Sequence, residues 1–319
     1  MIKEIIQFAV VNTINMVNSI LNNRQTFGTT VVFDLEDGLQ NVFDIKQSKN
    51  LKEETRNLLF NALNDRNKKT ISEYGIRINA LSSAEFYNDL KFLRGLNKNV
   101  KWKYVVVPKI NSQNDVVNCM NAFSENDIKL TEFIPIIETI NGFQNIKNIF
   151  SNKPNKLFHR SFWGQEDFNL DLKCWPLKDY THSDYWETLK TFITYIENAG
   201  YHYINGPSLN LSDHAVLKKI LGVVSTICHL DFDQVALSYE QVEFLLKIKD
   251  ITPLDYSEIV TNKFYTEEEK IDLAEKILVQ FQDNQIPGKS FSIYNGLIIS
   301  PHNYQAALNY LLKIKLTKC

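Results

Sequence analysis

Three carboxylates close an apolar stretch near the N-terminus. The segment TTVVFDLEDGLQN (29–41) passes from Val-Val-Phe directly to Asp34, Glu36 and Asp37. A strand that is buried enough to carry Val-Val-Phe does not end on clustered negative charge unless a cation or shared protons offset the repulsion. The pattern therefore predicts a positively charged partner at the end of this segment.

Polar side chains follow other apolar segments in the same way. They are Arg77 and Asn79 in YGIRIN, Lys109 in KYVVVPK, Glu138 in IPIIET, Glu166 and Asp167 in FWGQED, and Asn205 in YHYINGP. Acids on several separate segments, accompanied by arginine and lysine, are hard to explain as packing. Their grouping indicates a functional site.

Carboxylates supply the candidate metal ligands, because no Cys or His lies at a matching strand end. Oxygen-only sites suit Mg²⁺ or Mn²⁺ rather than Zn²⁺. Mg²⁺ usually takes one or two carboxylates and leaves positions for waters and substrate. The sequence predicts Glu138 and Asp167 as direct ligands, with Glu36 and Asp37 accepting hydrogen bonds from metal-bound waters. Arg77 is predicted to bind a substrate carboxylate through its planar fork.

Simpler roles exist for several of these residues. Glu138 and Asp167 each precede a predicted helix, so either one alone also fits an N-cap or a first-turn acid. Lys109 fits a counter-ion of Glu36 slightly better than it fits a catalytic role. A Schiff-base lysine would need an apolar, desolvated pocket, and the many nearby acids argue against such a pocket. No ligand spacing relates the histidines, which are expected to be solvated or hydrogen-bonded in loops or helices: His159, His182, His202, His214, His229 and His302.

The elements that must position these residues alternate regularly. Eight apolar segments are each followed by a segment with apolar residues at helical spacing. The strands are expected at 6–11, 29–37, 74–79, 103–109, 132–139, 157–167, 201–207 and 232–238. Such alternation is typical of a parallel sheet covered by helices. Eight units in about 250 residues predict an α/β fold of the (β/α)8 TIM-barrel type, with its chemistry at the C-terminal ends of the strands. An open doubly wound sheet is the alternative, but its G-x-G-x-x-G motif is absent from the end of the first strand.

The chain divides into two predicted parts. Residues 1–250 hold the eight units and form a catalytic barrel. Residues 251–319 hold a charged helix (266–284), a hairpin (290–300) and a final helix (302–314). This C-terminal extension is expected to pack on the barrel or on a neighbouring subunit. Within the barrel, Ser83 is predicted to cap one helix and Gly200 to end another.

Composition excludes several classes of protein. The 319 residues are 44% hydrophobic and 23% charged, which suits a globular protein with a sizeable core. A net charge of −2 gives no electrostatic basis for binding nucleic acid. No apolar run is long enough to span a membrane or to act as a signal peptide. The 4 cysteines are scattered without C-x-x-C spacing, so reduced thiols in a cytoplasmic protein are predicted.

Six segments resemble, in order, the successive motifs of a known family. They are VVFDLEDGL, IRINALSSAEFYNDL, VVVPKINS, IPIIETINGFQNIKNI, WGQEDFNLDL and NGLIISPHNYQAA. The family is that of the citrate lyase β-subunit and the HpcH–HpaI aldolases, which also includes malyl-CoA lyases. The resemblance extends from near Gln7 to about Leu311. It implies a (β/α)8 barrel that uses Mg²⁺ to cleave or form a carbon–carbon bond next to a 2-oxo or 3-hydroxy acid.

The resemblance also implies roles for individual residues. It places the family's metal ligands on Glu138 and Asp167, its substrate-binding arginine on Arg77, and the acidic pair of its DLED motif on Glu36 and Asp37. These positions are the ones reached from the strand ends. The family further implies a homo-oligomer, a trimer or hexamer, whose tails cover neighbouring subunits.

Three segments depart from the family pattern. A PGNRP-like turn after the first strand is replaced by VVNTIN, and an IHP after the eighth strand is replaced by LSY (237–239). The C-terminal segment that carries an acid in members handling acyl-CoA reads YNGLIIS here, with Asn295 and Ser300 in place of acids. These departures argue against a CoA thioester as substrate. They leave the metal and 2-oxo-acid residues intact.

The predicted function is a carbon–carbon lyase of the aldol type that depends on Mg²⁺ or Mn²⁺ and acts on a 2-oxo acid such as pyruvate or oxaloacetate. The metal would polarise the keto group and stabilise the enolate formed on cleavage, and Arg77 would add positive charge beside the enolate oxygen. Asp37 and a metal-bound water are both candidate proton carriers. The alternative is a catalytically degenerate barrel that binds a small acid or a partner protein without turnover, which the altered Asn295 and Ser300 would fit.

Overall fold

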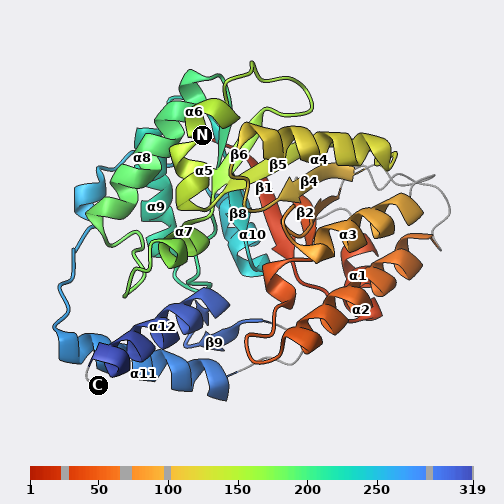
Figure 1. Cartoon of the computed structure of the whole chain (residues 1–319). Coiled ribbons are helices and arrows are strands. Elements are labelled where there is room, and N and C mark those ends of the chain that lie inside the picture. The colour runs from red at the N-terminus through yellow and green to blue at the C-terminus, as the bar shows by residue number, and fades with distance from the viewer. Residues whose placement is uncertain (23–28, 65–73, 97–101, 285–289, 318–319) are drawn as a thin grey trace.

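A computed structural model of the chain describes residues 1–22, 29–64, 74–96, 102–284 and 290–317 (Figure 1). Within these residues, eight parallel strands close into a barrel in sequence order, and the eighth pairs with the first. The strands are β1 (Ile2–Ala9), β2 (Thr29–Asp34), β3 (Gly75–Arg77), β4 (Trp102–Val107), β5 (Leu130–Ile137), β6 (Arg160–Trp163), β7 (His202–Asn205) and β8 (Phe232–Ala236). The predicted (β/α)8 barrel is confirmed.

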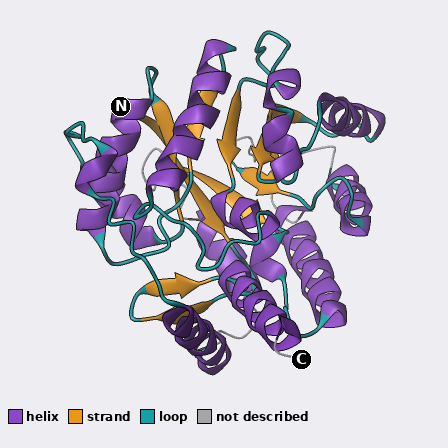
Figure 2. Cartoon of the chain, turned by 60° about the vertical axis from the view of Figure 1, so that its left-hand side comes forward, coloured by secondary structure: helices purple, strands orange, loops and turns teal. Residues whose placement is uncertain are grey.

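Helices surround these strands (Figure 2). They are α1 (Ile14–Asn22), α2 (Ile45–Asn64), α3 (Ala84–Gly95), α4 (Gln113–Glu125), α5 (Ile140–Gln144), α6 (Ile146–Ile149), α7 (Gln165–Asp171), α8 (Ser183–Asn198), α9 (His214–Ile227) and α10 (Tyr239–Lys247), with the 3₁₀ helices η1 (Asp37–Leu39) and η2 (Tyr256–Glu258). Ser83 caps α3 by accepting a hydrogen bond from the backbone N–H of Glu85. Gly200 follows α8 with a φ of +86°, where glycine is favoured. Both predicted helix boundaries are confirmed.

Four elements differ from the sequence expectation. β2 ends at Asp34 rather than at Asp37, because the chain turns into η1 there. β1 begins at Ile2 rather than at Ile6, because Glu4 faces ion-pair partners inside the barrel and does not interrupt the strand. The segment after β5 forms two short helices, α5 and α6, that meet at Asn145. The segment after β6 turns at once into the short helix α7, so Asp167 lies in the first turn of a helix rather than on a strand.

Apolar side chains alternate between the lumen and the outer layer along each strand, as the two-residue period of a strand requires. Val32 and Val106 pack in the lumen, whereas their neighbours Phe33 and Val105 pack between the strands and the helices. Both layers are closely filled, so the backbone of each strand end is held in place. Side chains at the C-terminal ends are therefore delivered to a common mouth.

The C-terminal extension covers this mouth. It consists of α11 (Glu267–Asp283), the antiparallel hairpin of β9 (Ser292–Tyr294) and β10 (Leu297–Ile299), and α12 (Pro301–Thr317). Figure 1 shows α11, α12 and β9 together in blue, beyond one end of the barrel. The backbone N–H of Ser290 donates to the carbonyl of Gly38 at 3.3 Å, and that of Ile298 donates to the carbonyl of Leu209 at 2.9 Å. The predicted hairpin is confirmed, and the extension packs on its own barrel; the domain division at residue 250 stays a prediction.

Two further expectations concern the cysteines and the membrane. Cys119, Cys174 and Cys228 are free thiols, and Cys319 lies outside the described residues. Across the described ranges, every helix falls short of the length and apolar character that a bilayer crossing demands.

Candidate active site

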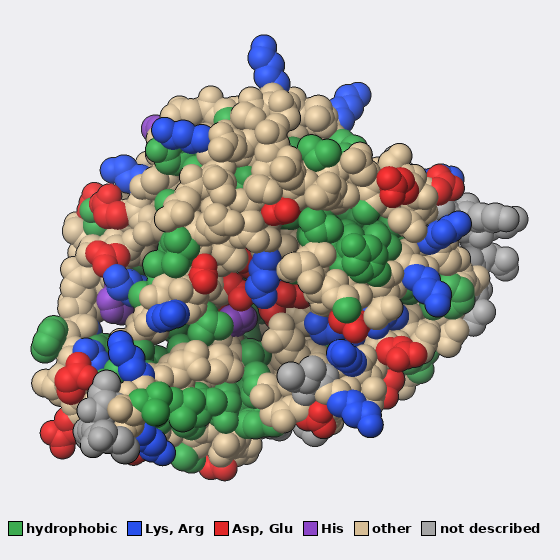
Figure 3. Space-filling view, viewed as in Figure 1, with side chains coloured by type: hydrophobic (Ala, Val, Ile, Leu, Met, Phe, Trp, Pro, Cys, Tyr) green, Lys and Arg blue, Asp and Glu red, His purple; other side chains and the backbone are tan. Residues whose placement is uncertain are grey.

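A cavity of about 540 Å³ lies between the C-terminal ends of the barrel strands and the extension. Figure 3 shows acidic, basic and histidine side chains together in a hollow between the two parts. Of the six residues that the sequence analysis weighed as metal ligands or catalytic groups, four line this cavity and two contact them directly. The lining residues are Asp37, Arg77, Glu138 and Asp167, and the contacting residues are Glu36 and Lys109.

Asp34 anchors the segment after β2. Its Oδ1 accepts a hydrogen bond from the backbone N–H of Glu36, and its Oδ2 accepts one from that of Gly38, both at 2.9 Å. A Cβ at position 38 would lie 2.6 Å from Asp34 Oδ2, so only glycine leaves the carboxylate its place. The DLEDG segment thus folds into η1 and presents Glu36 and Asp37 to the mouth.

Arg77, the last residue of β3, binds this segment. Its Nε and Nη2 each donate to Asp34 at 2.7 Å, and its Nη1 lies 3.1 Å from Asp37 Oδ2 and 3.2 Å from Glu36 Oε2. Burial alone would lower the pKa of Arg77, but the three carboxylates raise it well above its ordinary value. Asp34 thus binds the two nitrogens of Arg77 that the sequence analysis predicted to bind a substrate carboxylate. The role of Arg77 toward a substrate carboxylate stays a prediction.

Lys109 follows β4 in a left-handed conformation, with a φ of 58°. Its Nζ lies 3.3 Å from both Glu36 Oε1 and Asp167 Oδ1. Burial alone would lower the pKa of Lys109, but the surrounding carboxylates raise it above its ordinary value. A Schiff-base nucleophile must be neutral to react. The geometry therefore matches the counter-ion interpretation of Lys109 rather than the Schiff-base one.

Glu138 follows β5 and is 3% exposed. Its Oε1 accepts a hydrogen bond from the backbone N–H of Lys109 at 3.0 Å. A Cβ at position 164 would lie 2.3 Å from Glu138 Oε2, so Gly164 provides the space for this carboxylate. Burial, together with the negative charges of Asp167 and Glu36, raises the pKa of Glu138 well above its ordinary value. A buried acid surrounded by other acids is suited to a cation.

The helix-capping interpretations can be compared with the geometry. Thr139, not Glu138, caps α5, because its side chain accepts the backbone N–H of Gly142 at 3.0 Å. Gly164 occupies the N-cap of α7, and Asp167 lies in the first turn of that helix. The N-terminal end of a helix favours a negative charge at this position. The first-turn interpretation therefore fits Asp167, whereas neither Glu138 nor Asp167 is an N-cap.

Two residues of the extension enter the site, and sequence reasoning gave neither a role there. His302 is 9% exposed, and its Nε2 lies 3.0 Å from Asp167 Oδ2. Ser300 Oγ donates to Glu166 Oε1 at 2.8 Å. Burial alone would lower the pKa of His302, but Asp167, Asp37 and Glu166 raise it to about 10. The signal available in the sequence was the motif NGLIISPHNYQAA, because His302 lies two residues after the altered position 300.

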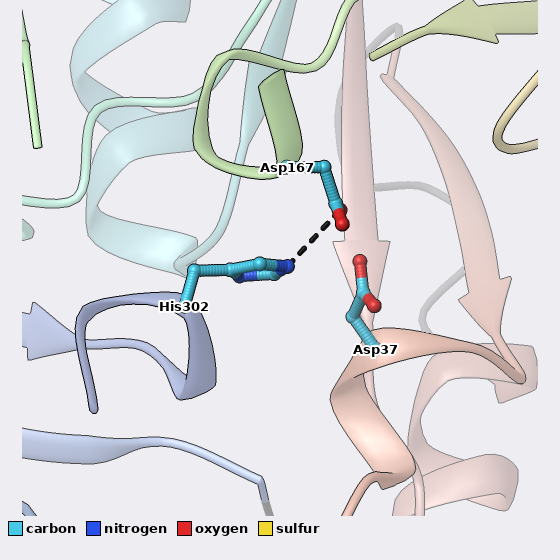
Figure 4. A group of neighbouring side chains, drawn as sticks. All are labelled: Asp37, Asp167 and His302. Carbon is cyan, nitrogen blue, oxygen red and sulfur yellow. Dashed lines mark hydrogen bonds and ion pairs between the residues drawn. The ribbon is translucent and has the colours of Figure 1, made fainter. Parts of the chain in front are cut away.

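Among the residues that the structure describes, Asp37, Asp167 and His302 form a group that could hold a metal ion. Each offers one ligand atom within 4.8 Å of the other two. Figure 4 shows that they come from three separate elements and that their side chains point toward one another. Glu138 lines the same cavity but lies outside this group. The predicted pairing of Glu138 with Asp167 around one metal stays a prediction.

The mouth carries an excess of negative charge. Six carboxylates lie there with three cationic groups, which are Arg77, Lys109 and the protonated His302. The carboxylates are those of Asp34, Glu36, Asp37, Glu138, Glu166 and Asp167. Burial and neighbouring carboxylates raise the pKa of Glu36, and burial raises that of Glu166. Oxygen donors in excess of their internal cations fit a hard divalent ion.

In enzymes with a (β/α)8 barrel the active site lies at the C-terminal ends of the strands, which is where this cavity with its charged residues lies. The sequence model of the HpcH/HpaI aldolase/citrate lyase family matches residues 19–238, and the chain belongs to this family. The protein is therefore a carbon–carbon lyase. The resemblance to the family is confirmed, and five of the six motifs lie within the matched residues; the sixth, at 295–307, lies outside them.

Solved structures share the fold at low sequence identity. RipC from Yersinia pestis is 18% identical, with a TM-score of 0.55 over 80% of this chain and 97% of that one. The protein CitE from Mycobacterium tuberculosis, in complex with magnesium and acetoacetate, is 18% identical, with a TM-score of 0.57 over 76% and 89%. The citrate lyase β-subunit from M. tuberculosis, complexed with oxaloacetate and magnesium, is 17% identical, with a TM-score of 0.56 over 76% and 95%. A search of the curated proteins found no match.

Proposed function

We propose that this protein is a divalent-metal-dependent lyase of the aldol type that cleaves or forms a carbon–carbon bond beside a 2-oxo acid or a related 3-hydroxy acid. One observation carries the proposal: carboxylates from η1, β5 and α7 converge on one cavity with more negative charge than the internal cations offset. The magnesium, oxaloacetate and acetoacetate bound by structural neighbours support the same metal and substrate class.

Asp167, Glu138 and Asp37 would hold the metal, which is Mg²⁺ or Mn²⁺. When bound, such an ion supplies a Lewis acid that polarises the keto group and stabilises the negative charge developing on its oxygen. Arg77 keeps Asp34 and Asp37 in place and adds positive charge near the reacting acid. Lys109 holds Glu36 and Asp167 at the rim of the site. Asp37 accepts hydrogen bonds from Gln40 Nε2 at 2.8 Å and from Arg77 Nη1 at 3.1 Å, and it stays a predicted proton carrier beside a metal-bound water.

The rest of the cavity indicates the kind of partner that the 2-oxo acid is joined to or released from. About 540 Å³ is much more than a three-carbon acid fills. Away from the carboxylates the wall is apolar and includes Phe8, Phe162, Trp163, Leu237 and Phe291. We propose an aldehyde or hydroxy acid with an apolar or aromatic substituent as the second group, because burial of its surface against this wall favours binding.

The lining also argues against a CoA thioester in this cavity. Within the described residues, its positively charged groups are Arg77 and His302, and both already pair with carboxylates. The phosphates of CoA would meet net negative charge here. One structural neighbour does bind coenzyme A together with magnesium and acetoacetate, so this point separates the present chain from that protein.

The direct test is turnover of 2-oxo and 4-hydroxy-2-oxo acids, followed by pyruvate release, with Mg²⁺ and with EDTA. We expect activity with Mg²⁺ and its loss in the chelator. An aldehyde series of increasing chain length is expected to raise kcat/KM until the apolar wall is filled. Full activity in EDTA would overturn the metal assignment.

A degenerate barrel that binds without turnover is the competing reading, and a thermal-shift experiment separates the two. Under the proposal, Mg²⁺ plus pyruvate raises the Tm, and Glu138→Gln removes this increase. The matched control is Glu243→Gln, which changes an exposed acid on α10 and is expected to keep the wild-type response. A chain whose Tm responds to neither ligand would favour the non-catalytic function.

Two remaining predictions belong to the same proposal. The family resemblance supports a homotrimer or hexamer, which light scattering coupled to size-exclusion chromatography tests. The unpaired cysteines support a cytoplasmic location. A monomer in solution would contradict the first, and it would fit an extension that covers its own barrel.

A further inference from the structure

We propose that His302, on the C-terminal extension, is a nitrogen ligand of the divalent ion and that metal binding therefore fastens the extension over the mouth of the barrel. The inference rests on the proposed function for the presence of a metal. It adds a ligand of a different chemical type to the oxygen donors of the barrel.

The imidazole ring of His302 lies next to the carboxylates of the barrel mouth. His302 Nε2 lies 3.0 Å from Asp167 Oδ2, and its ligand atom falls within 4.8 Å of those of Asp37 and Asp167. In Figure 4 the imidazole points between the two carboxylates, which reach it from η1 and α7. His302 Nε2 and Asp167 Oδ2 are thus already as close as two ligand atoms of one ion would be.

The other nitrogen of the His302 ring, Nδ1, is buried without a hydrogen-bond partner among the described residues. The residue as a whole is 9% exposed. A buried polar atom without a partner is uncommon and calls for an explanation. That Nδ1 lies 3.8 Å from Glu166 Oε2. Histidine ligands of metals usually donate their second N–H to a carboxylate, which fixes the ring and its tautomer.

Glu166 is itself held in place from the extension. Its Oε1 accepts the Ser300 hydroxyl at 2.8 Å, and Ser300 precedes His302 by two residues. Ser300, Glu166 and His302 thus form a short chain that leads to the ion, and Ser300 is a positioning residue. The family pattern has an acid at position 300. The serine found here instead donates a hydrogen bond to Glu166, which an ionised acid could not do.

An imidazole changes which metal the site prefers. Carboxylates alone suit Mg²⁺ and Mn²⁺, whereas imidazole nitrogen favours transition ions over Mg²⁺. We therefore expect Mn²⁺ to bind more tightly than Mg²⁺, and we expect His302→Gln to reduce this preference by about tenfold. An ion held by both the barrel and α12 also ties the two parts together.

The test is pulsed EPR of bound Mn²⁺, which detects nitrogen nuclei that coordinate the ion. We expect ¹⁴N modulation in the wild-type protein, its replacement by the ¹⁵N pattern after labelling with ¹⁵N-histidine, and its loss in His302→Gln. The labelling arm needs no variant, so it stands even if the substitution impairs folding. His229→Gln, which changes an exposed histidine after α9, is the control and is expected to keep the modulation.

Hydrogen exchange gives a second readout. Mn²⁺ is expected to slow exchange at the start of α12 in the wild type and not in His302→Gln. Ser300→Ala is expected to weaken Mn²⁺ binding about tenfold while the nitrogen modulation persists, and Ser300→Thr, which restores the hydroxyl, is expected to recover the affinity.

The outcomes separate this inference from the proposed function. Mn²⁺ that binds without nitrogen modulation overturns the role of His302 and leaves the metal-dependent lyase standing. Mn²⁺ that binds with the modulation but without turnover of any 2-oxo acid supports the ligand and overturns the proposed reaction. A chain that binds no Mn²⁺ overturns both.

Discussion

The two ends of the barrel lumen treat buried charge in opposite ways. At the N-terminal end, Arg160 Nη1 lies 2.9 Å from Glu4 Oε2 and 2.7 Å from Asp233 Oδ2, while its other nitrogens pair with Glu132. Lys103 Nζ completes the network at 2.6 Å from Glu4 Oε1. Each acid there has a fixed cationic partner within the chain.

The C-terminal end has no such balance. Six carboxylates meet three cationic groups, one of which, His302, arrives from the extension. Burial, together with the negative charges of neighbouring carboxylates, raises the pKa values of Glu36 and Glu138, and a bound cation would offset this repulsion. At the N-terminal end three acids share two cations, Arg160 and Lys103, and each acid has an ion-pair partner. At the C-terminal end the excess of acids is larger, and Glu138 has no ion-pair partner among the described residues. The comparison teaches that a buried acid left without a partner marks a functional site, whereas a fully paired network serves the fold.

Strand β5 offers the largest contrast, because Glu132 lies near its start and Glu138 directly after its end. Glu138→Gln is expected to lower kcat on the order of 10³-fold, about 4 kcal/mol, because it removes a charge that holds the metal. The Tm without metal should stay the same or rise, since one repulsive charge is lost. Steady-state kinetics with Mg²⁺ and thermal unfolding measure the two effects.

Glu132→Gln is the matched change at the other end of the strand. It leaves Arg160 with fewer partners, so we expect a lower Tm and an unchanged kcat per folded molecule. Equal losses of kcat in Glu138→Gln and Glu132→Gln would contradict the proposed difference between a catalytic C-terminal end and a structural N-terminal end.

Arg160→Met tests the N-terminal network most severely. The change strands Glu132 and Asp233, which are 2% and 1% exposed. An uncompensated buried charge is expected to cost about 3 kcal/mol of unfolding free energy. Urea unfolding measures the loss, and the affinity of the remaining folded protein for Mn²⁺ should match that of the wild type. A loss below about 1 kcal/mol would mean that the network does little for stability.

Sequence reasoning reached the C-terminal end more fully than the N-terminal one. Parallel strands deliver the residues after them to one edge, so Glu36, Arg77, Lys109 and Glu138 could be grouped from local patterns alone. The same reasoning placed the caps at Ser83 and Gly200, because capping depends on neighbouring residues.

Contacts between distant segments escaped it. Glu4 pairs with Arg160, which lies 156 residues away in the sequence. Because this partner could not be foreseen, Glu4 was not predicted to lie within β1, and the strand was predicted to start too late. His302 reaches Asp167 across 135 residues, and only the fold of the extension brings the two together. Asp34 was counted as one more acid at the mouth, whereas it binds the fork of Arg77. No local spacing encodes these three pairings.

Acid titration sharpens the comparison with a smaller effect. Burial alone would raise the pKa of Glu4, but hydrogen bonds from Lys103, Thr30 and Tyr104 lower it from 4.5 to about 2. A group with a folded pKa below its unfolded value stabilises the protein above pH 4.5, and the stabilisation disappears as the pH falls toward 2. We expect about 2 kcal/mol of this loss to come from Glu4. Urea unfolding at pH 5, 4 and 3 measures it, and Glu4→Gln should show a flatter dependence.

Lys109→Met gives the smallest and most discriminating change, because Lys109 is the closest counterpart of Arg160 at the mouth. Its ammonium lies 3.3 Å from both Glu36 and Asp167, next to the ligand group that a metal would use. Loss of this charge is expected to destabilise the metal-free protein by about 1 kcal/mol and to tighten Mg²⁺ binding several-fold, since a competing cation is removed. Calorimetric titration and thermal unfolding with and without Mg²⁺ measure both. If Lys109 were instead a Schiff-base nucleophile, borohydride with pyruvate would add mass to the wild-type chain and none to the variant. Either that added mass or an unchanged Mg²⁺ affinity in the variant would contradict the role of Lys109 as a counter-ion. Lys109 would then differ in function from Arg160 at the other end of the barrel.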